Sequence, residues 1–241
     1  MIELDAPDWW EQVPVLSGPS IRIREVEAAD AAALLELFSD TQVNRYLYTP
    51  PSTLVEFEGF IEWARRKRES ASCVCFVVVP NGLEQPIGLF QLRALDAEFQ
   101  LAEWGFAMAP SFWSTGLFEE AATLVAEFAF AIGVKRIEAR AVVENVRANR
   151  ALEKIGAKGE ALLRKAFKHN EPQFLWAIVA DEWSVPKPAP ATPFEAARIR
   201  AQIARALAEL PIVPRTIKHP WAPPPFPFFL TRRADEPPDE N

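Results

Sequence analysis

The sequence predicts a mixed α+β fold, in which helices pack against a β-sheet. Between about residues 20 and 183, stretches with strand-like apolar patterns alternate with stretches of helical periodicity. The chain has 241 residues and is 49% apolar, which is enough to bury a sizeable core. Composition changes near residue 184, because all nine glycines precede it and most of the 22 prolines follow it. We therefore expect an N-terminal segment over 1–19, a folded domain over 20–183 and a C-terminal extension over 184–241.

The first half of the domain contains both patterns. Residues 20–24 alternate apolar and charged side chains, as a half-buried strand does, whereas Phe57 and Phe60 fall on one face of a helix. A turn at residues 80–82 joins two apolar runs and predicts an antiparallel hairpin. In chain order we expect a strand over 20–24, helices over 29–38 and 53–68, and strands over 73–79, 86–95 and 100–108.

The second half is organised around one strongly apolar helix. Residues 117–131 are apolar around most of a helical circumference, so this helix should be buried against the sheet. Gly156 is placed to end a shorter helix. The other expected elements are a strand over 136–143, that shorter helix over 145–155, and strands over 158–167 and 174–180.

Composition argues against several classes of protein. The formal net charge is −7 and the acidic residues are spread along the chain, which disfavours a nucleic-acid binder. Cys73 and Cys75 form a C-x-C pair with only two histidines in the chain, so we expect no metal site. No run approaches the length of a membrane span and the first residues do not look like a leader. We expect a cytoplasmic protein with reduced thiols and no membrane partner.

The turn before the helix over 117–131 is a candidate anion site. It contains Ser114, Thr115 and Gly116, and it would present free backbone N–H groups at the positive end of the helix dipole. The alternative is an ordinary tight connection, because the chain carries neither a G-x-G-x-x-G nor a P-loop motif there.

Four blocks of sequence together resemble the GNAT family of acyl-coenzyme A N-acyltransferases, and within it the branch of the ribosomal-protein N-terminal acetyltransferases (RimJ/RimL type). The blocks are AEWGF at 102–106, WSTGLFEEA at 113–121, NVRANRALEKIGA at 145–157 and EALLR at 160–164. This resemblance implies a mixed, mostly antiparallel sheet with helices on both faces and a splayed parallel pair of strands over 100–108 and 136–143. It also implies acetyl-coenzyme A (acetyl-CoA) as cofactor and a primary amine as acceptor, either a peptide N-terminus or a small amine.

The resemblance also implies which residues hold the cofactor. The family's pyrophosphate loop, Gln/Arg-x-x-Gly-x-Gly/Ala, corresponds here to residues 113–118, with Gly116 kept, Trp113 in place of the Gln/Arg and Phe118 in place of the small residue. The expected cofactor-binding set is Phe106, Met108, Trp113, Ser114, Thr115, Gly116, Leu117, Phe118, Asn145, Asn149 and Arg150.

Acyl transfer to an amine needs a group that removes a proton from the amine. Glu103 is our candidate base, because it lies on the strand entering the expected cleft among apolar residues that would raise its pKa. The alternative is a strand carboxylate that faces solvent or pairs with Arg140. Asn145 is expected either to contact the cofactor arm or to cap a helix, and it can do both.

The acceptor side offers weaker candidates. Tyr46 and Tyr48 lie between the first two helices, where they would line the amine pocket or simply pack within a loop. Glu160 is a second acidic candidate on the acceptor side. No general acid is identified, since the position where this branch often has Ser is Ala148.

The C-terminal extension is expected to contain a helix over about 193–210 and then a Pro/aromatic-rich segment over 219–230. The helix is too short to be stable alone, so the extension should pack on the domain, on a second subunit in a homodimer, or on a partner. The alternative function is therefore an inactive acyl-CoA-binding or scaffolding protein that acts through this extension.

Overall fold

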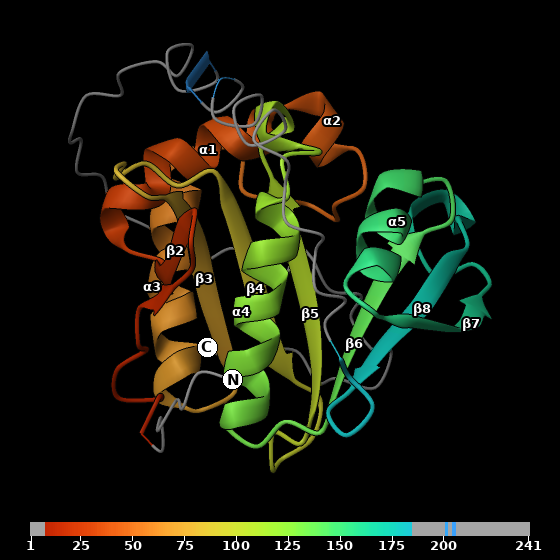
Figure 1. Cartoon of the computed structure of the whole chain (residues 1–241). Coiled ribbons are helices and arrows are strands. Elements are labelled where there is room, and N and C mark those ends of the chain that lie inside the picture. The colour runs from red at the N-terminus through yellow and green to blue at the C-terminus, as the bar shows by residue number, and fades with distance from the viewer. Residues whose placement is uncertain (1–7, 185–200, 202–203, 206–241) are drawn as a thin grey trace.

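The structure is a computed structural model that describes residues 8–184, 201 and 204–205 (Figure 1). Residues 201, 204 and 205 are helical. The rest of the helix predicted over 193–210, the Pro/aromatic segment and the homodimer contact predicted for the extension lie outside the described residues.

The described residues form one eight-stranded sheet with the order β1-β2-β3-β4-β5-β6-β8-β7. Neighbouring strands are antiparallel except β5 and β6, which are parallel. The predicted mixed, mostly antiparallel sheet with one parallel pair is confirmed. The strands are β1 (Leu16–Ser17), β2 (Ile21–Glu25), β3 (Cys73–Pro80), β4 (Gly88–Ala94), β5 (Leu101–Met108), β6 (Arg136–Val142), β7 (Lys158–Leu163) and β8 (Gln173–Val179).

Helices cover both faces of the sheet, as predicted (Figure 1). Alternate residues of β3 enter two different clusters: Val74 and Phe76 pack with α4, whereas Cys75 and Val77 pack with α1 and α3. Every residue of β3 is buried, because both faces are covered. The helices are α1 (Ala31–Ser39), α2 (Thr41–Asn44), α3 (Leu54–Glu69), α4 (Leu117–Ala131) and α5 (Val146–Lys154).

Sequence patterns account for where the long helices begin. α3 starts at Thr53, whose side chain and that of Glu56 form a reciprocal capping box. α4 spans the predicted range and buries eight of its residues.

The N-terminal segment also contributes to the core. Trp9 is only 4% exposed and its ring contacts Phe99 and Phe128. The short strand β1 pairs with β2, with Leu16 opposite Ile23. The folded unit described here therefore begins before residue 20, at least at Trp9.

The two parallel strands separate after a short contact, which positions the site. β5 and β6 pair only from Leu101–Glu103 to Arg136–Glu138. Beyond that point β5 stays bonded to β4 and β6 stays bonded to β8, so the two strands diverge (Figure 1). Beyond Glu103 and Glu138 the facing backbone edges of β5 and β6 form no ladder with each other. This is the splayed arrangement that the resemblance implied.

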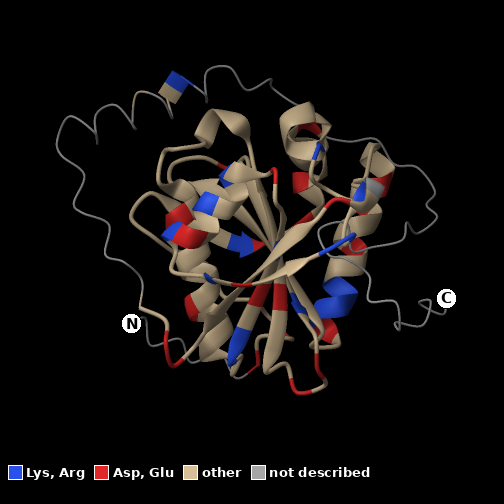
Figure 2. Cartoon of the chain, turned by 90° about the vertical axis from the view of Figure 1, so that its right-hand side faces the viewer, with Lys and Arg blue, Asp and Glu red and all other residues tan. Residues whose placement is uncertain are grey.

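Charged residues are distributed over the whole fold, with Lys and Arg interspersed among Asp and Glu (Figure 2). Cys73 and Cys75 are free, buried thiols on one face of β3. Among the described residues there is no cluster of three or more metal-ligating side chains. None of the helices in residues 8–184 combines the length and the apolar character that crossing a membrane requires.

Candidate active site

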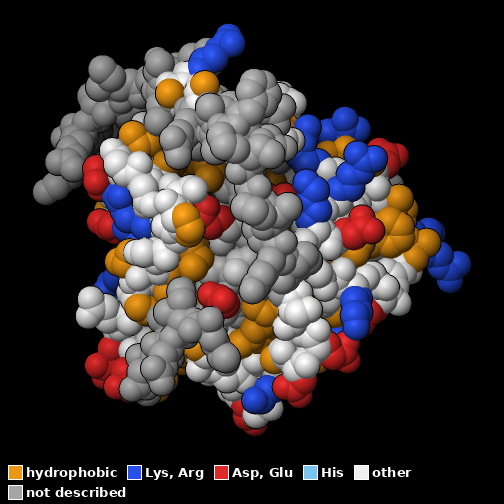
Figure 3. All heavy atoms as spheres, viewed as in Figure 1, with side chains coloured by type: hydrophobic (Ala, Val, Ile, Leu, Met, Phe, Trp, Pro, Cys, Tyr) orange, Lys and Arg blue, Asp and Glu red, His pale blue; other side chains and the backbone are white. Residues whose placement is uncertain are grey.

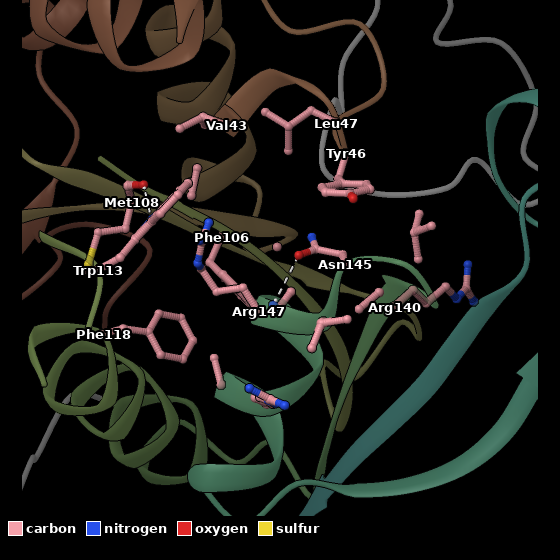
Figure 4. Close-up of a pocket in the computed structure, with 18 of the residues that line it drawn as sticks. Val43, Tyr46, Leu47, Phe106, Met108, Trp113, Phe118, Arg140, Asn145 and Arg147 are labelled. Carbon is pink, nitrogen blue, oxygen red and sulfur yellow. Dashed lines mark hydrogen bonds between the residues drawn. The ribbon is translucent and has the colours of Figure 1, made fainter. Parts of the chain in front are cut away.

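A cavity of about 570 Å³ lies where β5 and β6 diverge (Figure 4). Its walls are residues 104–108 of β5 and 140–142 of β6. One end is closed by the loop before α4 and by the first turns of α5, and the other by residues 42–47 around α2. The cavity therefore has a loop end and an α2 end, joined by the splayed strands.

The loop end is shaped by its backbone. Ser114 and Gly116 both adopt positive φ angles, +61° and +85°. The Thr115 hydroxyl donates to the Phe112 carbonyl at 2.6 Å and accepts from the backbone N–H of Leu117 at 3.4 Å. Of the six predicted loop residues, Trp113, Ser114 and Phe118 line the cavity, whereas Thr115, Gly116 and Leu117 do not. Thr115 and Leu117 are buried beneath the turn, whereas Gly116 is exposed.

Gly116 is required by its backbone conformation rather than by crowding, since a Cβ there would meet nothing within 4 Å. We expect Gly116→Ala to lower the free energy of unfolding by about 1 kcal/mol, the cost of an L-residue at positive φ. Chemical denaturation would measure this loss. Gly159→Ala is the control, because the φ angle of Gly159 is not positive and an added Cβ would lie at an ordinary 3.7 Å from the Trp176 ring. An unchanged midpoint for Gly116→Ala would contradict the role assigned to this φ angle.

Trp113 and Phe118 replace the residues usual in the loop, and both pack against the sheet. The Trp113 indole N–H donates to the Met108 carbonyl at 2.8 Å. The Phe118 ring lies 4.7 Å from that of Phe106 and 5.7 Å from that of Phe90. The bulk of Phe118 is therefore supported by β4 and β5 while it lines the cavity, as the predicted residues Phe106 and Met108 also do.

The first turn of α5 faces the loop. The Asn145 side chain accepts from the Ala148 backbone N–H at 3.1 Å, so the predicted cap is present, and Asn145 also lines the cavity (Figure 4). The Arg147 guanidinium lies 3.4 Å from the centre of the Trp113 ring, a cation–π contact between α5 and the loop. Arg147 thus joins the two sides of the loop end.

The charged side chains that line the cavity are mostly cationic, whereas the chain as a whole is acidic. Its lining includes Arg140, Arg147, Arg150 and Lys154 but a single carboxylate, Glu119, which pairs with Lys154 at 3.4 Å. Figure 3 shows blue side chains gathered on the α5 side of the molecule. In a chain with net charge −7, this local excess of cations favours an anionic ligand.

Asn149 does not line the cavity, although the sequence resemblance implied cofactor contact. Its side-chain amide donates to the carbonyls of Val142 and Asn145, both at 3.0 Å, and accepts from the Trp176 indole at 2.9 Å. These bonds connect α5 to β6 and β8, so the Asn149 side chain holds elements of the domain together.

We therefore expect Asn149→Ala to lower the free energy of unfolding by about 1 to 3 kcal/mol, because it leaves buried partners unsatisfied. The neighbouring Arg150 lines the cavity and is exposed, so Arg150→Ala should leave stability unchanged. Denaturation of both variants in parallel would check this. Equal losses of stability would contradict the assignment.

Glu103 lies where the two strands begin to diverge, and it is 1% exposed. Its carboxylate accepts from Arg93 at 3.2 Å and lies 3.6 Å from the Arg140 Nε. The predicted alternative of pairing with Arg140 is present, and exposure to solvent is not. Burial raises the pKa of Glu103, and the two arginines oppose that rise. Glu103 does not line the cavity, whereas Arg140 does. Its role as a base stays a prediction.

The two tyrosines are placed differently at the α2 end of the cavity. Tyr46 lines the cavity and its hydroxyl donates to the Glu144 carbonyl at 3.4 Å. Tyr48 does not line it: the hydroxyl donates to the Ala166 carbonyl at 3.3 Å and the ring packs 4.6 Å from that of Phe167. Because Phe167 lines the cavity, Tyr48 supports the wall from outside.

Glu160 is not part of this site. Its carboxylate accepts two bonds from Arg136, at 2.9 and 2.5 Å, and this pairing lowers its pKa. Arg136 begins β6, whereas the cavity lies against residues 140–142 at the end of that strand. The expectation that Glu160 binds substrate is therefore corrected, because it sits at the opposite end of β6.

Several residues that line the cavity were not predicted from the sequence, and two of them, Arg147 and Gln173, are polar residues at informative positions. Arg147 stands in the middle of the first turn of α5, and Gln173 opens β8, one residue before the strand start predicted at 174. A polar side chain at the first position of an otherwise apolar strand was the available signal for Gln173.

Comparisons with known proteins agree with this fold. The family described as acetyltransferase (GNAT) domain matches residues 20–158. The uncharacterised N-acetyltransferase YoaA of Bacillus subtilis is 26% identical over 163 residues, covering 65% of this chain and 90% of that protein. A GNAT-family acetyltransferase from Bacillus anthracis superposes with a TM-score of 0.62 at 25% identity, covering 70% of this chain and 100% of that one. Mycobacterium smegmatis RimJ, solved with CoA-disulfide, has the same fold, with a TM-score of 0.63 at 21% identity over 78% of this chain and 94% of that one.

Proposed function

Because the chain belongs to the GNAT acetyltransferase family, we propose that it transfers an acetyl group from acetyl-CoA to a primary amine by direct attack on the thioester. The observation that carries the proposal is the cavity between the splayed strands, whose lining is cationic in an acidic chain. Acetyl-CoA is an anion with several phosphate charges, and it supplies the activated acetyl group.

The residues at the loop end fit the phosphate-bearing part of this cofactor. Arg147, Arg150 and Lys154 provide cations from one helix, and the loop before α4 adds the positive end of a helix dipole. The open edges of β5 and β6 offer backbone donors and acceptors to an extended, amide-containing arm. Trp113 and Phe118 form walls of the cavity and so border the space proposed for the cofactor.

The α2 end is then the place for the acceptor. An attacking amine must be neutral, and the Arg140 guanidinium disfavours a positive charge beside it. None of the described side chains that line the α2 end is a carboxylate. Glu103, which lies outside the cavity lining and in contact with Arg140, is therefore the carboxylate we propose as base, acting through one bridging water. The acceptor is proposed as a peptide N-terminus or a small amine.

Two measurements on the full-length chain test the proposal. Calorimetric titration with acetyl-CoA should show saturable binding and raise the melting temperature, because a ligand bound to the folded state stabilises it. Release of free thiol should then depend on added amine, in a panel of short peptides and small amines. Absence of acetyl-CoA binding would reject the proposal.

A further inference from the structure

Gln173 occupies a distinctive position at the α2 end of the cavity. It is the first residue of β8 and lies opposite Val142, the last residue of β6, in the antiparallel ladder. Both residues line the cavity. Gln173 also lies beyond residue 158, where the family match ends.

The side-chain oxygen of Gln173 lacks a hydrogen-bond partner among the described residues. The residue is 4% exposed, and this oxygen, Oε1, is itself buried. Buried polar atoms in folded proteins are nearly always satisfied, since leaving one without a partner costs free energy. Gln173 itself lines the cavity, so a ligand there that brings an N–H donor can satisfy this oxygen after a turn of the buried amide.

The surroundings of Gln173 indicate which kind of N–H donor a ligand would bring. Phe167 and Val142 give the α2 end apolar walls, and Arg140 contributes a cation whose guanidinium is held by Glu103. A cation nearby disfavours a second positive charge, so a neutral amine N–H suits the position better than an ammonium. This is also the protonation state that can attack a thioester.

We propose that Gln173 positions the acceptor amine, its Oε1 accepting one N–H while the nitrogen lone pair attacks. The inference rests on the proposed function. A neutral primary amine has two N–H groups: one is held by Gln173 and the other proton is lost to the base. The C–N bond forms as the C–S bond breaks, and coenzyme A leaves as a thiolate that takes up a proton. Gln173 is thus a specificity residue for the acceptor, not for the cofactor.

A bisubstrate conjugate isolates this contact without knowledge of the natural acceptor. The probe is coenzyme A whose sulfur is joined through a methylene-carbonyl bridge to the N-terminus of trialanine, so that one N–H remains on the acceptor nitrogen. Calorimetry compares its affinity with that of coenzyme A alone, for the wild type, Gln173→Met and Gln173→Glu. Methionine keeps the length of the side chain without the acceptor oxygen, and glutamate keeps the oxygen.

We expect the wild type to bind the conjugate more tightly than coenzyme A, and Gln173→Met to lose about 10-fold in affinity for the conjugate with unchanged affinity for coenzyme A. Gln173→Glu should retain the tighter binding. Without ligand, Gln173→Met should melt no lower than the wild type, because an unsatisfied polar group has been removed. This stability readout separates positioning from a purely structural role.

Three results would overturn the inference. They are equal affinity of Gln173→Met and the wild type for the conjugate, equal losses for conjugate and coenzyme A, or a lower melting temperature of unliganded Gln173→Met. A wild type that binds coenzyme A but binds the conjugate no better also overturns the inference and leaves the proposed function standing. A wild type that binds neither compound overturns both.

Discussion

Glu103→Gln is expected to lower kcat/KM for the acceptor by at least about 100-fold, the usual contribution of a general base. It should also remove the acid limb of the pH–rate profile. Burial raises the pKa of Glu103 above its ordinary value of 4.5, so the carboxylate form that accepts a proton is lost as pH falls through that raised pKa. In the wild type the rate should therefore rise with pH across that interval, and in the variant it should not.

Glu138→Gln is the matched control for this experiment. Glu138 is the register partner of Glu103 on β6, but it pairs with Arg136, away from the cavity. Its substitution should keep the acid limb but move it to lower pH, because the Glu138 charge is one of the causes that raise the pKa of Glu103. Melting curves for both variants confirm that they are folded at the assay temperature. A Glu103→Gln rate that falls while the acid limb persists would assign Glu103 to holding Arg140, and an unchanged rate would remove it from the mechanism.

Arg147→Glu is expected to weaken acetyl-CoA binding by about 10-fold or more, with little change in the folded state. The substitution replaces a cation at the loop end by an anion and breaks the contact with Trp113. A charge-assisted contact to a phosphate contributes about 1.5 to 3 kcal/mol, and each 1.4 kcal/mol changes a dissociation constant about tenfold. Because Arg147 is exposed, the loss should shrink as ionic strength rises.

Lys135→Glu is the control, because it makes the same change in net charge at a position away from the cavity. Lys135 is exposed and directly precedes β6, at the end of the strand away from the cavity. Calorimetry at two salt concentrations on the two variants and the wild type separates a local contact from a general effect of net charge. Equal weakening by both substitutions would show that Arg147 has no specific role. If Arg147→Glu alone weakens binding, Arg147→Lys measures what the planar stack on Trp113 adds.

The candidate site was only partly predictable from the sequence. Asn145 was expected both to cap a helix and to reach the cleft, and the structure places it at both positions. Asn149 and Glu160 were assigned to ligands by their places in matching blocks, yet their side chains are bonded to α5, β8 and Arg136 instead. A block of sequence identifies a backbone segment, but the direction and partners of each side chain depend on what packs opposite.

Local patterns in the sequence determined the elements of this protein. The helix over 117–131 was predicted with its observed bounds, because a continuous apolar circumference and a glycine turn are properties of neighbouring residues. The same holds for the alternating strand near residue 21. The motif blocks added the splayed parallel pair of strands and the loop that precedes α4.

Tertiary structure alone decided which side chains meet in the cavity. Arg140, Arg147 and Gln173 come from β6, α5 and β8, and Trp113 comes from a loop far from them in sequence. Their convergence depends on the point at which β5 and β6 lose register, after Glu103 and Glu138. That point is set by the packing of helices on both faces and by the pairing of each strand with its outer neighbour. No local pattern encodes it, because it arises from contacts between residues distant along the chain.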